Sequence, residues 1–138
     1  MAKYWDCLAE YDAESTSWST PSGVGGSTTT GLYSPQYNGR LVGLRVVVNR
    51  DAASSLTNHV QFKISCPTFT PNSMIVGGQG SGLQTAPAFQ SGRDSTLDYE
   101  ADQVVQAGVP IQIEARDVTA DTPVTNSVLL YGCFTAGG

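Results

Sequence analysis

The chain has 138 residues, of which 40% are hydrophobic and only 14% are charged, and its formal net charge is −5. This length suits one domain that buries a core without disulfide or metal support. The acidic balance and the absence of any run of Lys or Arg argue against direct binding of nucleic-acid phosphates or of anionic membranes. No stretch of about 18 apolar residues occurs, so we expect no membrane insertion.

The low charge is the most informative feature of the composition. An average soluble chain has about 25% charged residues, because charge keeps free proteins apart. A surface of Ser, Thr, Gly and Gln is easier to cover with a neighbouring protein. We therefore predict that this chain assembles, with a secreted or merely charge-poor domain as the alternative.

The N-terminus and the cysteines indicate where the chain is made. Residues 1–6 show no apolar segment of a signal peptide, which predicts synthesis in the cytoplasm. The three cysteines Cys7, Cys66 and Cys133 are odd in number and widely spaced. This usage is typical of buried thiols rather than of a disulfide framework.

The first 38 residues predict one strand followed by an arm. Residues 4–11 alternate, with Trp5, Cys7, Ala9 and Tyr11 on one face, as in a strand. Residues 15–31 are nearly all Ser, Thr, Gly or Pro, a composition that cannot form a core. We expect residues 1–38 to form an N-terminal strand and arm, and residues 39–138 to form a single domain.

The body reads as a succession of strands. Residues 59–66 and 110–117 alternate between apolar and polar side chains, which predicts strands with one buried face. Residues 41–49 and 127–135 are apolar on both faces, so we place them centrally, in positions where the two strands can pair with each other. Weaker strands are predicted at 74–76, 83–89 and 102–106, and residues 95–100 are ambiguous.

This pattern predicts an all-β fold. No segment has the 3.6-residue apolar period of a helix, and about eight strands follow residue 39, as in an antiparallel sandwich or barrel. The predicted core consists of Leu44, Val46, Val48, Val60, Phe62, Ile64, Ile111, Ile113, Val128, Leu130 and Phe134.

Catalytic chemistry is not indicated. The single histidine, His59, begins a strand beside a loop, which favours an exposed residue over a catalytic one, and one histidine cannot build a His-rich metal site. The cysteines are expected to be small buried hydrophobes. The glycine-rich stretches 23–28 and 77–82 lack the Lys and the following helix of a phosphate loop. We therefore predict no enzyme activity, no catalytic residues, no metal and no cofactor.

One acidic cluster leaves an alternative open. Asp94, Asp98, Glu100 and Asp102 could bind Ca²⁺ through oxygen ligands, but their spacing does not match the D-x-D-x-D-G pattern. A solvated loop is the favoured interpretation, and cation binding stays open.

Aromatic residues gather in the first 37 positions. Trp and Tyr often anchor protein interfaces, so an aromatic-rich and charge-poor arm suits contact with a neighbour. The alternatives are a sugar-stacking platform and a cap on the domain's own core. The predicted interface residues are Tyr4, Trp5, Tyr11, Trp18, Tyr33 and Tyr37.

Taken together, the body from the strand at 39–48 to the closing strand at 128–134 resembles an eight-stranded jelly roll preceded by an arm. A charge-poor jelly roll of this kind is similar to the small capsid proteins of tailless icosahedral double-stranded DNA viruses. It looks above all like the single-jelly-roll capsid proteins of archaeal viruses of the Sulfolobus polyhedral virus type. The resemblance covers the chain in pattern and includes no diagnostic motif. It implies a virion protein whose partners are copies of itself and other capsid proteins.

Two further functions remain as alternatives. A carbohydrate-binding or adhesin-like module would stack sugars on Trp18 or on the tyrosines. A decoration or fibre protein would bind a shell that another chain builds.

Overall fold

The computed structural model describes residues 3–11, 17–21, 31–49, 60–76, 94–117 and 128–137. This part of the chain contains eight strands and no helix that is long and apolar enough to cross a membrane. The strands are β1 (Lys3–Tyr11), β2 (Leu32–Tyr33), β3 (Gly39–Asn49), β4 (Val60–Ser65), β5 (Ser73–Val76), β6 (Asp94–Val105), β7 (Ile111–Asp117) and β8 (Val128–Ala136).

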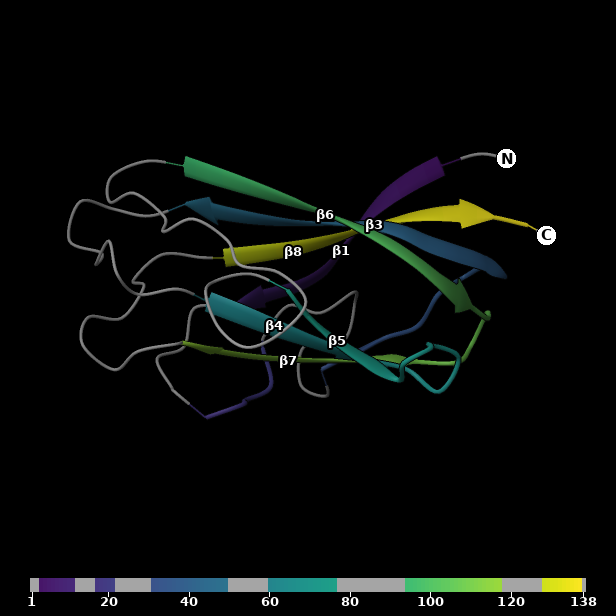
Figure 1. Cartoon of the computed structure of the whole chain (residues 1–138), viewed down its shortest axis with the longest axis horizontal. Helices are drawn as coiled ribbons and strands as arrows, with labels where there is room; N and C mark the ends of the chain where they lie inside the picture. The colour runs from purple at the N-terminus through teal and green to yellow at the C-terminus, as the bar shows by residue number, and fades with distance from the viewer. Residues whose placement is uncertain are drawn as a thin grey trace.

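The strands form two antiparallel sheets of four strands that face each other as a β-sandwich (Figure 1). Sheet A has the order β1-β8-β3-β6, and sheet B has the order β2-β7-β4-β5. The expected all-β class and antiparallel sandwich are confirmed. The strand at the C-terminal end, β8, lies between β1 and β3, as its two apolar faces predicted.

The pairing is nested from the ends of the chain inward. β1 pairs with β8, β2 with β7, β3 with β6, and β4 with β5. Two further ladders, β3 with β8 and β4 with β7, join these pairs into the two sheets. Every sheet therefore depends on residues that are far apart in the sequence.

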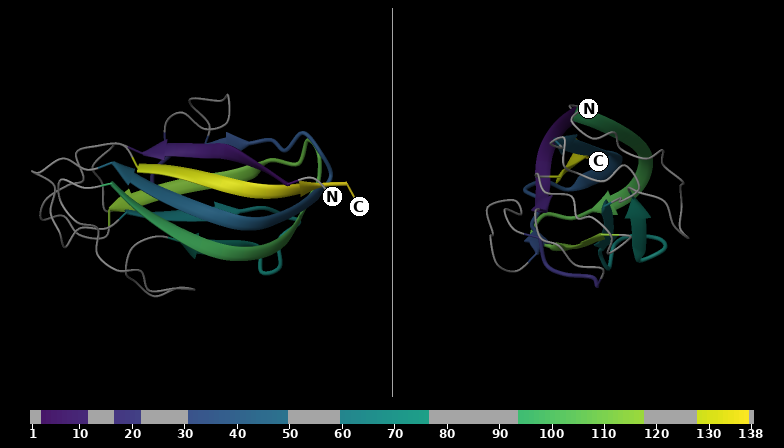
Figure 2. Two further views of the ribbon diagram at one scale, coloured as in Figure 1. Left: turned by 90° about the horizontal axis from the view of Figure 1, so that it is seen from above. Right: turned by 90° about the vertical axis from the view of Figure 1, so that its left-hand side faces the viewer.

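The two ends of the sandwich differ. β1 begins and β8 finishes at one end (Figures 1 and 2). The short turns at 34–38, 66–72 and 106–110 lie at this same end, because they join the strands that meet there. We call this the short-turn end. β3, β5 and β7 finish at the opposite end.

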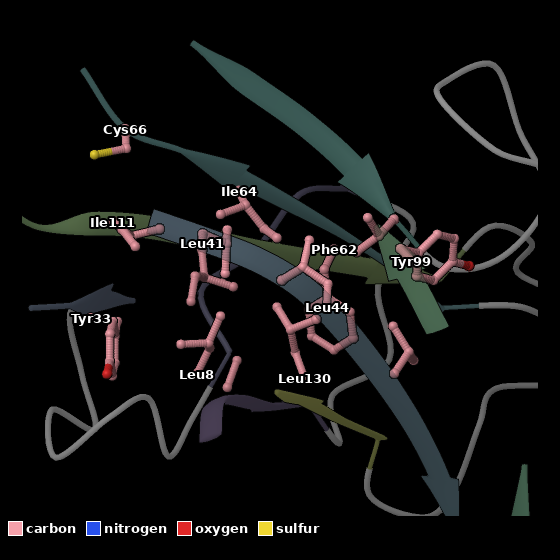
Figure 3. Packing of buried hydrophobic residues seen from close by; sticks show 14 of the residues in the cluster. Leu8, Tyr33, Leu41, Leu44, Phe62, Ile64, Cys66, Tyr99, Ile111 and Leu130 are labelled. Atoms are coloured by element: carbon pink, nitrogen blue, oxygen red, sulfur yellow. The ribbon is translucent and has the colours of Figure 1, made fainter. Parts of the chain in front are cut away.

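The core fills the space between the sheets (Figure 3). Alternate residues of β4 and β7 point inward, because a strand places successive side chains on opposite faces. Nine predicted core residues have at most 1% of their surface exposed. They are Leu44, Val46, Phe62, Ile64, Ile111, Ile113, Val128, Leu130 and Phe134. The side chains of Val48 and Val60 lie outside the described residues.

β1 differs from its predicted pattern. The pairing with β8 shifts between Cys7 and Ala9, so Leu8 is an extra residue in the strand. Leu8 and Ala9 are both fully buried, whereas Trp5 is 48% exposed on the outer face. A β-bulge of this kind moves following side chains to the other face. The expectation that Trp5 and Ala9 share a face is therefore wrong.

Residues 3–38 contribute to both sheets. β1 is an edge strand of sheet A, and β2 is an edge strand of sheet B. The backbone of Ser19 also pairs with Ala115 of β7, farther along the same edge as β2. The described parts of the predicted arm thus pack on the body of the sandwich.

The acidic segment is a strand rather than a loop. β6 covers both the ambiguous residues 95–100 and the predicted strand 102–106, and it forms one edge of sheet A. The predicted strand at 83–89 lies outside the described residues. Of the eight strands in the described residues, six follow residue 38, where about eight were predicted.

Candidate functional site

The outer face of sheet A carries a large exposed aromatic residue beside ion pairs. The guanidinium carbon of Arg45 lies 4.7 Å from the centre of the Trp5 ring, in a cation–π contact. Arg45 also donates hydrogen bonds to both carboxylate oxygens of Asp98, at 2.7 and 3.3 Å. The hydrogen bond to Asp98 raises the pKa of Arg45 above its ordinary value. These contacts hold Trp5 and Arg45 together on the surface.

A shallow hollow lies next to this aromatic residue. Its volume is about 230 Å³, and it is lined by Trp5, Arg45, Val47 and Tyr131. Its lining comes from β1, β3 and β8, whose outward side chains meet there. An apolar hollow with one guanidinium at its side suits protein contact better than it suits a chemical reaction.

Three acidic residues of β6, Asp98, Glu100 and Asp102, are spread along the strand and do not cluster. Asp98, Glu100 and Asp102 all point to the outer face of sheet A, and successive members are about 7 Å apart along the strand. Asp102 accepts a hydrogen bond from Arg40 at 2.6 Å, as Asp98 does from Arg45. The described residues contain no group of three His, Cys, Asp or Glu that could hold a metal ion. The side chain of Asp94 and all of His59 lie outside those residues.

The outer face of sheet B is polar, and two of its basic side chains contact the ring of Trp18. Lys63 and Arg116 lie 5.0 and 4.4 Å from the centre of the Trp18 ring. Lys63 also pairs with Glu114 at 3.6 Å, and Arg116 donates two hydrogen bonds to Gln61. Gln61 is 2% exposed although it points away from the core. Trp18 and its polar neighbours therefore cover part of this face.

A ladder of aromatic rings runs from the surface into the short-turn end. Tyr37 meets Tyr4 edge-on, and Tyr4 stacks on Phe134, which stacks on Tyr33. The hydroxyl of Tyr33 donates a hydrogen bond to Asp6 at 2.5 Å. Since Tyr33 belongs to sheet B and Asp6 to sheet A, this bond joins the two sheets across their edge.

We predict that Tyr33→Phe lowers the free energy of unfolding by about 1.5–3 kcal/mol at neutral pH, because a hydrogen bond to a carboxylate is lost. Burial, and then the bond to Asp6, raises the pKa of Tyr33 above 10.0. At a pH between the ordinary pKa and the raised one, the Tyr33 hydroxyl loses its proton only in the unfolded chain. The contribution of Tyr33 to the free energy of unfolding is therefore complete below pH 10 and falls above it. Urea unfolding between pH 8 and pH 11 measures this effect. The free energy of unfolding should fall less steeply with pH in Tyr33→Phe than in the wild type, by up to about 1.4 kcal/mol per pH unit.

Tyr37→Phe is the matched control, because Tyr37 is 54% exposed. It should keep the steep alkaline fall in the free energy of unfolding, because the Tyr33–Asp6 hydrogen bond is intact. Burial also raises the pKa of Tyr4, so some alkaline loss of stability should remain in Tyr33→Phe. Identical slopes in the wild type and in Tyr33→Phe would contradict the prediction.

The cysteines show no sign of a nucleophile. Cys66 and Cys133 are buried. Partial burial raises the pKa of Cys7, and the nearby carboxylates of Asp6 and Glu10 act in the same direction. A raised pKa disfavours the reactive thiolate.

The structure separates the predicted interface residues. Trp5 lies on the outer face of sheet A, Trp18 lies on that of sheet B, and Tyr4, Tyr33 and Tyr37 form the aromatic ladder. The side chain of Tyr11 lies outside the described residues. Arg45, Val47 and Tyr131 were not among the predicted surface residues. The outward positions of Arg45 and Val47 follow from the alternation within 41–49.

Comparisons with known proteins add no relative. No protein-family model matches the chain, and no curated protein shows significant sequence similarity to it.

Proposed function

We propose that this chain is a capsid subunit built on a jelly roll. The observation that carries the proposal is the nested pairing β1–β8, β2–β7, β3–β6 and β4–β5, folded into two four-stranded sheets. A jelly roll is an eight-stranded double sheet of two Greek keys, found in viral capsid proteins and in lectins. The nested order supports this topology over a simple meander.

Jelly rolls occur in several classes of protein, and the low charge of this chain favours a shell subunit over the other classes. With 14% charged residues, the chain has little charge to keep copies apart. Within the described residues, three large hydrophobic residues are exposed, Trp5, Tyr37 and Val104. Burial of such residues between subunits is the main driving force of most protein association. We propose copies of this chain, and other capsid proteins, as its partners in a virion after synthesis in the host cytoplasm.

The first 38 residues were predicted to form a strand and an arm that contacts a neighbour, but in the structure they also supply strands and core residues of the sandwich. Deleting them would remove β1, β2 and the buried residues Leu8, Ala9 and Tyr33, so the remainder is not expected to fold. In the proposed shell this region completes the subunit, and its outward side chains, such as Trp5, contact neighbours. Substitutions on the outer faces are therefore better tests of assembly than truncation.

Carbohydrate binding has less support. Sugar binding of the kind considered above needs an aromatic ring with an open face. The ring of Trp18 is engaged by Lys63 and Arg116, and the ring of Trp5 is engaged by Arg45. A glycan array would detect such binding if it occurred.

The test of the proposal is the mass and shape of the purified full chain. We expect light scattering to detect species far larger than the 14.5 kDa monomer, and electron microscopy to show closed shells or regular capsomers. Binding only to shells formed by another protein would favour a decoration protein. A monomer that persists at high concentration, alone and with candidate shell partners, would contradict both.

A further inference from the structure

Two charged residues on the outer face of sheet A differ from the other charged residues of the two outer faces in their contacts. Lys3 and Glu100 are both exposed, and neither has an ion-pair partner among the described residues. By contrast, Arg40, Arg45 and Lys63 each pair with a carboxylate, and Arg116 binds Gln61 and Trp18. One face therefore carries a cation on β1 and a carboxylate on β6 that have no ion-pair partner in the part of the chain that the structure describes.

The register places these charges at opposite edges of the face. Trp5, Cys133, Gly43 and Glu100 form one row across β1, β8, β3 and β6. Lys3 lies two residues from Trp5 on the same face of β1, about 7 Å along the strand. The indole of Trp5 leans from β1 toward the middle of the sheet, where its Cη2 atom would lie 3.9 Å from a Cβ on Gly43. An exposed aromatic ring thus lies near the centre, between opposite charges.

We propose that a second copy of this chain binds here, with the outer faces of the two A sheets in contact about a twofold axis that runs along the strands between β8 and β3. The inference rests on the proposed function and names the face that the copies share. The rotation lays β1 of each copy over β6 of the other. Lys3 of one copy then lies over Val104 of the other. Glu100 is in the next outward row of β1, about 7 Å along the strand and beyond Asp102, which already has an ion-pair partner, and a lysine side chain can span that offset. The two Trp5 rings meet near the axis.

The face has the composition and size of a modest specific interface. Trp5, Val47 and Tyr131 supply an apolar centre, and Lys3 and Glu100 supply a charged rim, as in known interfaces. Four strands about 4.8 Å apart and about 30 Å long cover about 600 Å² on each copy. About 1,200 Å² in total is at the lower end of specific interfaces. Such a contact suits one of several that hold a shell together.

The outer face of sheet B offers no comparable site in the described residues. Lys63 and Glu114 pair with each other, and Trp18 is engaged by its own cations. Charge complementarity between copies therefore points to sheet A.

The experiment uses charge reversal in the full chain. Lys3→Glu and Glu100→Lys each place like charges opposite each other at two symmetry-related positions. Each should raise the concentration needed for association by about tenfold or more, as measured by sedimentation velocity at low salt. The double variant restores opposite charges and should return to within about threefold of the wild type. Gln112→Glu, which adds a negative charge to the outer face of sheet B, should associate like the wild type.

The outcomes separate this inference from the proposed function. Loss of association in both single variants with recovery in the double variant supports the contact. If the wild type assembles and the single variants assemble equally well, the contact is wrong and the capsid proposal stands. Failure of the double variant to recover also overturns the Lys3–Glu100 pairing. A wild type that never associates overturns the proposed function and this contact together.

Discussion

Gly39→Ala is expected to lower the free energy of unfolding by about 3 kcal/mol or more. Gly39 begins β3 opposite Ala136 of β8, and a Cβ built on it would lie 1.8 Å from the carbonyl oxygen of Thr135. That oxygen belongs to the backbone of β8, so no side-chain rotation can relieve the clash. The first residues of β3 would have to separate from β8, with loss of ladder hydrogen bonds. Urea unfolding followed by tryptophan fluorescence measures the effect.

Gly43→Ala is the matched control in the same strand. A Cβ on Gly43 would find its nearest neighbours at 3.6 Å, which is ordinary contact. Alanine also loses less backbone entropy than glycine in a strand, so this variant should lie within about 1 kcal/mol of the wild type. Equal unfolding midpoints for the two variants would refute the close approach of β3 and β8 at Gly39.

A second large loss is expected for Phe134→Ala, of about 3–5 kcal/mol. Phe134 is fully buried in β8, with ring centres 5.5 Å from Tyr4 and 5.6 Å from Tyr33. Removing its ring leaves a cavity in the middle of the aromatic ladder, and two further rings lose their stacking partner. Thermal unfolding should show a lower midpoint, and the dye ANS should report exposed apolar surface if the sheets loosen.

The control for this variant is Tyr37→Ala, at the exposed end of the same ladder. Tyr37 contacts Tyr4 edge-on and keeps 54% of its surface in water, so its loss should cost less than about 1 kcal/mol. A Phe134→Ala protein as stable as Tyr37→Ala would show that the ladder does not hold the short-turn end together.

The alternation of apolar and polar residues within single segments was the most reliable guide to the strands. It predicted the strands around Phe62 and Ile113, because a half-buried strand repeats every two residues. The central position of β8 beside β3 followed from a different pattern, because residues 41–49 and 127–135 are apolar on both faces. These conclusions need only the composition of single segments.

The sequence did not predict features that depend on contacts between distant segments of the chain. The bulge at Leu8 lies where the alternation is interrupted, because residues 7–9 are three consecutive apolar residues. That interruption alone does not say which residue is the extra one, since the bulge is defined by the register between β1 and β8. β6 was partly read as an acidic loop because its inward side chains include Ala101 and Gln103, which are not typical of a core. The docking of Trp18 on Lys63 and Arg116 joins residues far apart in the chain. No local pattern could have revealed these contacts.

The position of β8 has a consequence for how the protein is made. β8 follows β1, β3 and β6 in the chain, so it is the last of these four strands to leave the ribosome, yet it separates β1 from β3 in sheet A. Until it emerges, β1 has no partner in its sheet and β3 has only β6, so a nascent chain exposes unpaired strand edges that favour aggregation. Sheet A can therefore close only after translation of β8, and we expect yields of soluble protein to depend on chaperones that shield the unpaired edges of β1 and β3.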